Sequence, residues 1–247
     1  MSFHGRFCWY ELMTSDPDGA AAFYREALGW KAIDSGMPGG DYRLFQVGEQ
    51  NVGGLMGQIP NGPAPSWLAY VAVEDIGATV AAAKAGGANV HREPTEIPGI
   101  GHFAIFADPQ GALLAILQPL LQAPGSPTPP CAGWHELHTT DQPAACDFHG
   151  RLFGWSRSRG IEMGPMGIYQ IIARGSEDIG AVFNASDASP PYWMFYFTVP
   201  ALDTAATKVT RAGGAIMHGP MEVPGGNWVV NARDPQGARF SLVAPGR

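Results

Sequence analysis

An internal repeat constrains the fold of this 247-residue chain more than any other feature of its sequence. The segment WYELMTSD at residues 9–16 returns as WHELHTTD at residues 134–141. Six of the seven tryptophans fall in matched pairs, so chance cannot account for the repeat. We therefore predict two copies of one α+β module, packed as a pseudo-dimer. Further matched pairs are ALGW at 27–30 and LFGW at 152–155, AGGA at 85–88 and 212–215, and DPQGA at 108–112 and 234–238.

A proline-rich stretch separates the two copies. Its sequence is APGSPTPP at residues 123–130. Proline fixes φ and lacks a backbone donor, so this stretch is expected to be an extended linker and not a helix or strand. We predict a first domain over residues 1–118, a linker over 119–131 and a second domain over 132–247.

Each copy is predicted to begin with a strand and a capped helix. Side chains alternate in direction along a strand, which puts Trp9 and Glu11 of residues 7–13 on one face. Asp16 can cap a following helix over residues 17–28, and Gly29 can end it in a left-handed conformation.

Short strands and a second helix complete the predicted copy. The matched DPQG segment is a turn between the last two strands. The layout predicts two βαβββ units per copy and four in the chain, beginning near residues 7, 67, 134 and 193. The expected elements after the first helix are strands at 31–35, 42–48, 51–58 and 67–73, a helix at 75–85, and strands at 102–107 and 113–118.

Composition excludes several classes of protein. Hydrophobic residues make up 45% of the chain and charged residues 15%, which is typical of a folded globular protein. The net charge of −7 and the lack of a basic cluster argue against binding to nucleic acid or an anionic membrane. No apolar run reaches the roughly 18 residues that a membrane helix needs. With no signal peptide visible, we expect a soluble cytoplasmic protein.

The three cysteines, Cys8, Cys131 and Cys146, include no CxxC pair. This odd, scattered set argues against a disulfide framework or a zinc site. We expect buried or incidental thiols.

Taken together, these motifs resemble the vicinal oxygen chelate superfamily, which includes glyoxalase I, bleomycin-resistance proteins and extradiol dioxygenases. The resemblance covers nearly all of residues 5–245 and is nearest to two-domain bacterial members. It implies tandem βαβββ units that form curved mixed sheets, with helices on the outer face and a site on the concave face. The carrying features are the first strand that ends in Asp, the helix AxxFYxxxLGW, the second helix that ends in AGG, and DPxG before the last strand.

In catalytic members, the resemblance implies a divalent metal held by His, Gln or Glu of first strands and Glu of last strands. Strong ligands are missing at the matching positions of this chain, because tryptophan and alkyl side chains offer no suitable donor. We therefore expect no cofactor, with a divalent metal as the alternative. The positions are Trp9, Gly53 or Gly54, Trp67 or Leu68, and 114–116 in the first copy, and Trp134, Gly180 or Ala181, Trp193 or Met194, and 240–242 in the second.

Glu11 and Glu136 are the candidate catalytic residues. Each lies two residues after a first-strand tryptophan and shares its face of the strand. Each could bond to backbone or arginine at a rim, bind a ligand or act as a general acid or base, or serve as a shifted metal ligand. His138 shares the face of Glu136 and could contact the ligand, or the two residues together could make half of a metal site, whereas His135 points the other way.

The remaining candidate ligand-binding residues are tryptophans and one histidine. Trp9, Trp67, Trp134 and Trp193 could line a cleft for a flat aromatic ligand or simply fill the core. His102 stands where the second copy has Trp228, so it could tune one pocket or serve as a surface or capping residue. His149 replaces Tyr24 on a helix and is expected at the surface.

Three functions are compatible with these residues. The first is a glyoxalase-like or bleomycin-resistance-like protein that binds a small aromatic or amphipathic metabolite in a tryptophan-lined cleft. The second is a lyase or ring-cleavage dioxygenase-like enzyme, either metal-dependent or acid/base, that uses Glu11, Glu136 and His138. The third is a non-catalytic structural or interaction protein. The expected partner is a small molecule, and the expected state is a monomer or homodimer.

Overall fold

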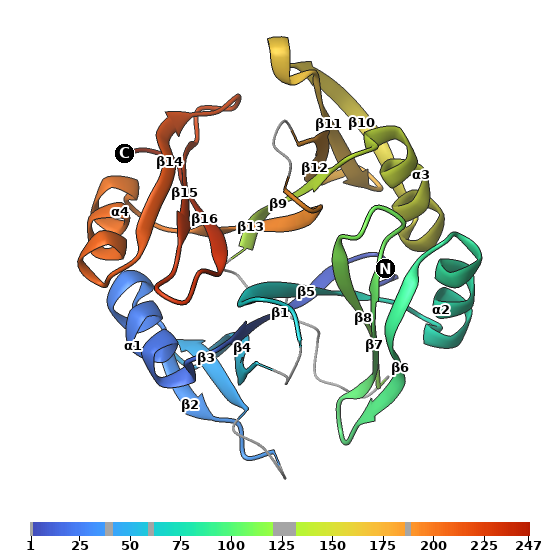
Figure 1. Cartoon of the computed structure of the whole chain (residues 1–247), viewed down its shortest axis with the longest axis horizontal. Helices are drawn as coiled ribbons and strands as arrows, with labels where there is room; N and C mark the ends of the chain where they lie inside the picture. The colour runs from blue at the N-terminus through green and yellow to red at the C-terminus, as the bar shows by residue number, and fades with distance from the viewer. Residues whose placement is uncertain (1, 38–41, 59–61, 121–131, 186–188) are drawn as a thin grey trace. The chain divides into compact units, whose positions relative to one another are not determined.

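Four βαβββ units follow one another along the chain in the computed structural model, which describes residues 2–37, 42–58, 62–120, 132–185 and 189–247 (Figure 1). The first half contains β1 (Phe7–Thr14), α1 (Pro17–Leu28), β2 (Lys31–Asp34), β3 (Arg43–Val47), β4 (Gln50–Gly57), β5 (Ser66–Ala72), α2 (Ile76–Ala85), β6 (Asn89–Ile97), β7 (Gly101–Ala107) and β8 (Leu113–Pro119). The second half contains β9 (Ala132–Thr139), α3 (Gln142–Phe153), β10 (Trp155–Glu162), the 3-10 helix η1 (Gly164–Met166), β11 (Ile168–Arg174), β12 (Glu177–Asn184), β13 (Tyr192–Thr198), α4 (Leu202–Arg211), β14 (Ala215–Glu222), β15 (Trp228–Arg233) and β16 (Arg239–Ala244).

The strands form two eight-stranded mixed sheets, so the predicted α+β class with tandem βαβββ units is confirmed. Their strand orders are β2-β3-β4-β1-β5-β8-β7-β6 and β10-β11-β12-β9-β13-β16-β15-β14. The first strand of each unit pairs in parallel with the last, as Glu11 opposite Gly54 and Glu136 opposite Ala181 illustrate. The other pairings inside each unit are antiparallel hairpins.

Helix capping agrees with the sequence in both copies. The Asp16 carboxylate accepts a hydrogen bond from the Gly19 amide at 2.9 Å, and Asp141 accepts one from Ala144 at 3.0 Å. Gly29 ends α1 with φ of 73°, which is favourable because glycine has no Cβ to clash. The matched capping residues therefore set both helices at the predicted positions.

One strand escaped prediction. β6 is exposed along most of its length and contains Pro94, so it lacks both the apolar alternation and the continuous apolar run that mark a strand. Nearly every side chain of β1 is buried, on both faces of the strand, so its alternation in direction is not an alternation between core and solvent.

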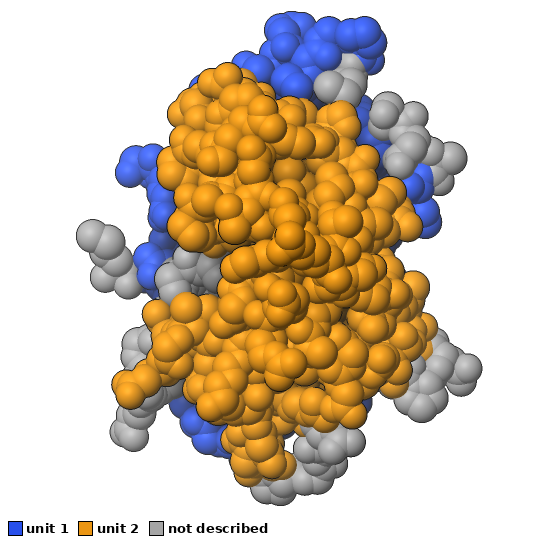
Figure 2. Space-filling model, turned by 90° about the vertical axis from the view of Figure 1, so that its left-hand side faces the viewer, with its two compact units in different colours: residues 1–8, 69–128, 134–193 blue, residues 9–68, 129–133, 194–247 orange. Residues whose placement is uncertain are grey.

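The chain divides into two compact units, called unit 1 and unit 2 from here on to distinguish them from the βαβββ units. Each of the two draws on both halves of the sequence (Figure 2). Unit 1 consists of residues 1–8, 69–128 and 134–193, and unit 2 of residues 9–68, 129–133 and 194–247. The domain boundaries predicted at residues 1–118 and 132–247 stay a prediction. The predicted linker, residues 119–131, lies almost wholly outside the described residues.

Aromatic side chains build the interior of each unit. In unit 2, Tyr10 of β1 contacts Phe195 and Phe197 of β13 edge to face, at ring-centroid distances of 5.5 and 6.4 Å. In unit 1, Phe7 contacts Trp193 in the same manner at 5.7 Å. The helices α1 and α4 pack together on the outer side of the strands of unit 2, as α2 and α3 do in unit 1 (Figure 1).

The DPQG turns have the predicted structure, and their aspartates organise them. Asp108 Oδ1 accepts hydrogen bonds from the amides of Gln110, Gly111 and Ala112, at 2.8–3.0 Å. Gly111 has φ of 108°, a conformation that a residue with a Cβ rarely adopts. In the second copy, Asp234 Oδ1 likewise accepts bonds from the turn, so each carboxylate keeps its Oδ2 for another partner.

Candidate functional site

A tryptophan, a tyrosine and a glutamate form a hydrogen-bonded triad in unit 2. Trp9 and Glu11 lie two residues apart on β1, and Tyr42 immediately precedes β3. The Trp9 indole Nε1 donates to Tyr42 Oη at 3.0 Å, and the Tyr42 hydroxyl is hydrogen-bonded to the Glu11 carboxylate. Glu11 is 8% exposed, so the carboxylate is withdrawn from bulk water but not sealed.

The same triad recurs in unit 1. Trp134 Nε1 donates to Tyr169 Oη at 2.7 Å, and Tyr169 in turn donates to Glu136 Oε1. Glu136 is also 8% exposed, whereas Trp134 is half-buried. The repeated sequence therefore reproduces a three-residue arrangement, and not merely a fold.

The direction of both hydrogen-bond chains follows from donor chemistry. An indole N–H can only donate, so each tyrosine oxygen accepts from tryptophan and gives its single proton to glutamate. Burial, followed by the negative charge of the neighbouring glutamate, raises the pKa of Tyr42 and of Tyr169 well above the usual range. Each tyrosine therefore stays a neutral phenol that holds one side of a carboxylate.

His138 makes the site around Glu136 different from the site around Glu11. Its Nε2 lies 3.5 Å from Glu136 Oε2, a distance within reach of an ion pair and longer than a good hydrogen bond. The ring stacks on Tyr192 at a centroid distance of 4.3 Å, with Phe183 equally close on a tilted plane. Met13 stands at the matching position of the first copy, so the Glu11 site has no imidazole there.

His135 confirms the expected alternation along β9, because it lies on the opposite face from Glu136. Its ring stacks on Phe7 at 3.8 Å, with Nδ1 placed 2.6 Å from the carbonyl oxygen of Ile179. Burial lowers the pKa of His135 to about 4, although the hydrogen bond to Ile179 acts in the other direction. This histidine is a neutral core residue.

Gly54 gives Tyr42 the room to reach Glu11. A Cβ on Gly54 would lie 2.0 Å from Tyr42 Oη and 2.6 Å from Cζ of the same ring. The glycine that stands at an expected ligand position thus serves the triad in this structure. Neither tyrosine was singled out from sequence, although Tyr42 and Tyr169 are themselves a matched pair of the repeat.

Trp67 and Trp193 lie in the interiors of their units. Each is 6% exposed, and the Trp67 indole donates to Tyr24 Oη at 2.8 Å. Trp193 packs against Trp155 and Phe7. The core-filling interpretation, which the sequence left open, accounts for both residues, and their contact with a ligand stays a prediction.

The two other histidines considered from sequence lie apart from the triads. His102 is exposed on β7, opposite Glu96 on one side and Gln118 on the other. The expectation that His149 lies at the surface is wrong, because the residue is 2% exposed. It faces the interior of unit 1 on α3, as Tyr24 does on α1 in unit 2.

The residues present do not supply the ligand set that the resemblance implies. Within the described ranges, no group of three or more His, Cys, Asp or Glu side chains gathers in a way that could hold a metal ion. Glu136 and His138 offer two donors, whereas catalytic zinc sites commonly use three protein ligands. Glu136 Oε1 is moreover engaged by Tyr169. The side chains of these sites thus fit a carboxylate held by phenol and indole better than a resident metal.

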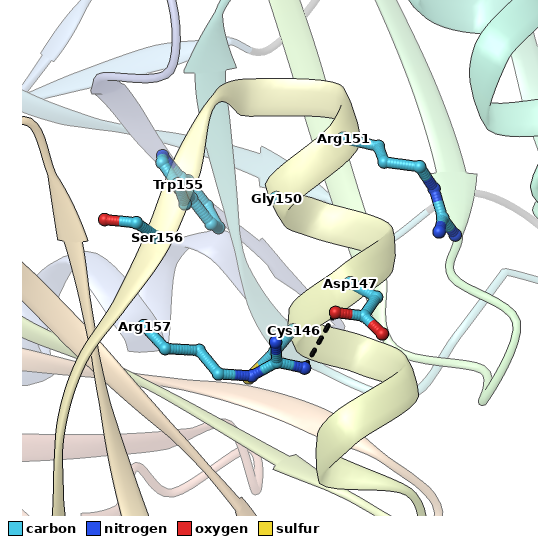
Figure 3. Close-up of a pocket in the computed structure, with 7 residues that line it drawn as sticks. All are labelled: Cys146, Asp147, Gly150, Arg151, Trp155, Ser156 and Arg157. Carbon is cyan, nitrogen blue, oxygen red and sulfur yellow. Dashed lines mark hydrogen bonds and ion pairs between the residues drawn. The ribbon is translucent and has the colours of Figure 1, made fainter.

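A surface hollow of about 400 Å³ lies along α3 and β10 in unit 1 (Figure 3). Arg157 crosses it and donates to Asp147 Oδ1 at 2.7 Å, so the two charges compensate each other. Burial raises the pKa of the Cys146 thiol beside them, and Arg157 partly opposes that shift. No residue predicted to belong to the site lines this hollow. It is lined by Cys146, Asp147, Gly150, Arg151, Trp155, Ser156 and Arg157.

The cysteines Cys8 and Cys146 are free and buried, as expected, and Cys131 lies outside the described residues. Burial raises the pKa of Cys8 to about 12. A thiol so protonated is a poor nucleophile. None of the helices in the described parts of the chain has the length and apolar character needed to cross a membrane.

Comparison with solved structures shows the fold. The Mn(II)-bound glyoxalase from Novosphingobium aromaticivorans superimposes with a TM-score of 0.68 and 16% sequence identity, over 99% of this chain and 83% of that one. The 2,3-dioxygenase LapB from Pseudomonas sp. KL28 gives 0.67 and 15%, over 98% and 93%.

Comparison with curated sequences gives full-length relatives. The protein CFP32 of Mycobacterium tuberculosis (strain CDC 1551 / Oshkosh) is 28% identical over 96% of this chain and 94% of its own length. The anthracycline biosynthesis protein DnrV of Streptomyces peucetius is 27% identical over 97% and 93%.

A family model confirms the resemblance drawn from the sequence motifs, and it matches both halves of the chain. The matched residues are 6–116 and 132–242. The chain belongs to the Glyoxalase/Bleomycin resistance protein/Dioxygenase superfamily.

Proposed function

We propose that the protein binds small aromatic or amphipathic molecules at its two Trp–Tyr–Glu triads. The observation that carries this proposal is the recurrence of a tyrosine-held, nearly buried carboxylate beside a half-buried indole. A carboxylate has about four lone-pair sites, so one that accepts from tyrosine can still accept from a ligand hydroxyl or amine. The indole offers an apolar face to the ligand's ring.

The ligand class follows from this pairing of groups. A carboxylate that accepts hydrogen bonds selects a donor such as a phenol or an amine, and it disfavours anions. Two relatives, DnrV of Streptomyces peucetius and DauV of Streptomyces sp. (strain C5), are named as anthracycline biosynthesis proteins. Anthracyclines carry hydroxyl groups on fused aromatic rings, so an anthracycline is a suitable first probe.

Isothermal titration of the protein with an anthracycline and with a simple phenol tests the proposal. Binding to both triads gives two sites per chain. Glu11→Gln and Glu136→Gln should each weaken one site about 10–100-fold, because a hydrogen bond to a charged group contributes about 1.5–3 kcal/mol. The double variant should weaken both. Binding that is unchanged in the double variant contradicts the proposal, and lack of binding by the unaltered protein favours the structural or interaction role.

Acid/base catalysis at the Trp134–Tyr169–Glu136 triad is the second candidate function. The 3.5 Å distance between His138 Nε2 and Glu136 Oε2 favours it. Two titratable groups so close can divide the roles of general acid and general base. His138→Met gives the second site the residue that the first site has. Under this proposal the variant keeps ligand binding and loses turnover, whereas Met13→His leaves turnover intact. Equal turnover with and without His138 contradicts catalysis by this pair.

We further infer that the protein works in the cytoplasm as a monomer or homodimer, with small molecules and not nucleic acids as its partners. The net charge of −7 supports this inference because it repels polyanions. Size-exclusion chromatography with light scattering tests the oligomeric state.

A further inference from the structure

A buried tyrosine hydroxyl joins three elements in unit 2. Tyr24 Oη on α1 donates to Asp234 Oδ2 at 3.2 Å and accepts from Trp67 Nε1 at 2.8 Å. Tyr24 is fully buried, and Asp234 is 4% exposed. The hydroxyl therefore satisfies the indole donor of Trp67 and the carboxylate acceptor of Asp234, two residues that are nearly buried.

The matching residues of unit 1 are His149, Asp108 and Trp193. The Trp193 and His149 rings meet edge to face at 5.5 Å and 87°, as Trp67 and Tyr24 do at 5.4 Å and 89°. His149 Nε2 and Asp108 Oδ2, however, lie 3.9 Å apart, too far for a hydrogen bond. Trp193 Nε1, His149 Nε2 and Asp108 Oδ2 are all buried without a hydrogen-bond partner in the described part of the chain.

The hydrogen bond at Nδ1, on the other side of the His149 imidazole, determines whether Nε2 carries a proton. His149 Nδ1 lies 2.9 Å from the carbonyl oxygen of Ala145, which can only accept, so Nδ1 carries a proton. Burial lowers the pKa of His149, although Asp108 and the Ala145 carbonyl act in the other direction. A neutral ring protonated at Nδ1 has a bare lone pair at Nε2. Two acceptors, Nε2 and Asp108 Oδ2, then face each other beside one donor, Trp193 Nε1–H.

We propose that unit 1 binds one internal water molecule between Trp193, His149 and Asp108, at the place that the Tyr24 hydroxyl takes in unit 2. Water has the required hydrogen-bonding capacity, because it can donate one proton to Nε2 and one to Oδ2 while it accepts from Nε1–H. Internal waters typically make about three such bonds to buried polar groups. The imidazole is shorter than the phenol, so under this proposal the water oxygen takes the place of the outer atoms of the phenol. This site is separate from the triads and independent of the proposed function.

Two measurements on the unaltered protein test the proposal. A crystal structure should show a solvent peak at hydrogen-bond distance from all three atoms. Nitrogen-15 spectra at pH 7 should show His149 protonated at Nδ1 and bare at Nε2, and the Trp193 indole proton should show cross-relaxation with a long-lived water. A ring protonated at both nitrogens, in direct contact with Asp108, overturns the proposal, as does a well-ordered crystal without the solvent peak.

Reciprocal variants provide matched controls. In His149→Tyr the phenol oxygen should replace the water, so the Trp193–water signal disappears and the Tm rises by about 2–4 °C. In Tyr24→His a new signal should join the Trp67 indole to water. A Trp193–water signal that persists in folded His149→Tyr overturns the proposal. If that variant fails to fold, the crystal and nitrogen-15 results of the unaltered protein decide.

Discussion

Tyr169 on β11 donates its only hydroxyl proton to Glu136 on β9, so the carboxylate is held by a residue of a strand that is separated from its own by β12. The Tyr169 oxygen accepts a hydrogen bond from the Trp134 indole, which fixes the direction in which the hydroxyl proton is donated. Tyr42 holds Glu11 in the same way in the other copy. The carboxylates are thus oriented before any ligand arrives, which reduces the entropy lost on binding.

Replacing Tyr169 with phenylalanine should destabilise the protein by about 1–3 kcal/mol, because Glu136 loses its donor and the Trp134 indole loses its acceptor. Urea unfolding followed by circular dichroism measures the change. Tyr42→Phe is the matched control in the other unit and should cost a similar amount. A Tyr169→Phe variant as stable as the unaltered protein would show that the triad is not a structural element.

Gly54→Ala should displace Tyr42 from its present position and weaken the Trp9–Tyr42–Glu11 triad, although the second copy forms its own triad with Ala181 at the matching position. The new Cβ would lie 2.0 Å from Tyr42 Oη, so the phenol must shift from its present position beside Glu11. Titration with the anthracycline should then show one strong site in place of two. Gly57→Ala, on the same strand, is the control, since its Cβ meets nothing nearer than 3.9 Å. Two intact sites in folded Gly54→Ala would contradict this expectation.

Stability should fall when the pH drops from about 6.5 to about 4, because His135 is kept neutral by burial. Its pKa is lowered to about 4 in the folded protein, so the unfolded chain binds a proton first as the pH falls. The stabilising contribution is complete above pH 6.5, and about 3 kcal/mol is lost by pH 4. Urea unfolding at pH 7, 5.5 and 4.5 measures the slope.

His135→Tyr, which introduces the residue of the first copy, should reduce that slope without removing it. The pKa of His149 is also lowered by burial, so it contributes in the same direction. A slope that His135→Tyr leaves unchanged would show that His135 is protonated in the folded state or accessible to water.

Neither half of the sequence should form a stable monomer alone. Unit 2 joins Tyr10 to Phe195 and Phe197, and unit 1 joins Phe7 to Trp193, so each interior needs side chains from both halves. A protease site placed within residues 121–131 tests this. After cleavage, the two fragments should elute together, and residues 1–120 expressed separately should not unfold cooperatively as a monomer. Independent, cooperative folding of either half contradicts the expectation.

The repeat made most of the fold predictable, because one assignment of helices and strands had to fit both matched sequences. Capping residues such as Asp16 and Gly29 marked the helix ends directly. β6 was missed because its stability comes from pairing with β7 and not from an apolar pattern of its own. His149 was wrongly predicted at the surface because a polar side chain on a helix is usually exposed. Its burial depends on packing near Asp108, in a turn that is distant in sequence.

The candidate site was predictable in part for a similar reason. Glu11 and Glu136 could be placed on a strand face with their tryptophans from spacing alone. Their tyrosine partners could not, since the contact between β1 and Tyr42 depends on how the strands pair. Whether Trp67 and Trp193 line a cleft or fill the interior likewise depends on packing that periodicity does not encode.

The presence of both copies in one polypeptide has a consequence for how the sites can evolve. In an assembly of two identical chains, every substitution appears twice, once at each symmetry-related position. Here Met13 is matched by His138, and Tyr24 by His149, while the tryptophan, tyrosine and glutamate of each triad are retained. Covalent joining therefore permits one site to acquire a new side chain while its duplicate preserves the older chemistry, which is a freedom that a symmetric homodimer does not have.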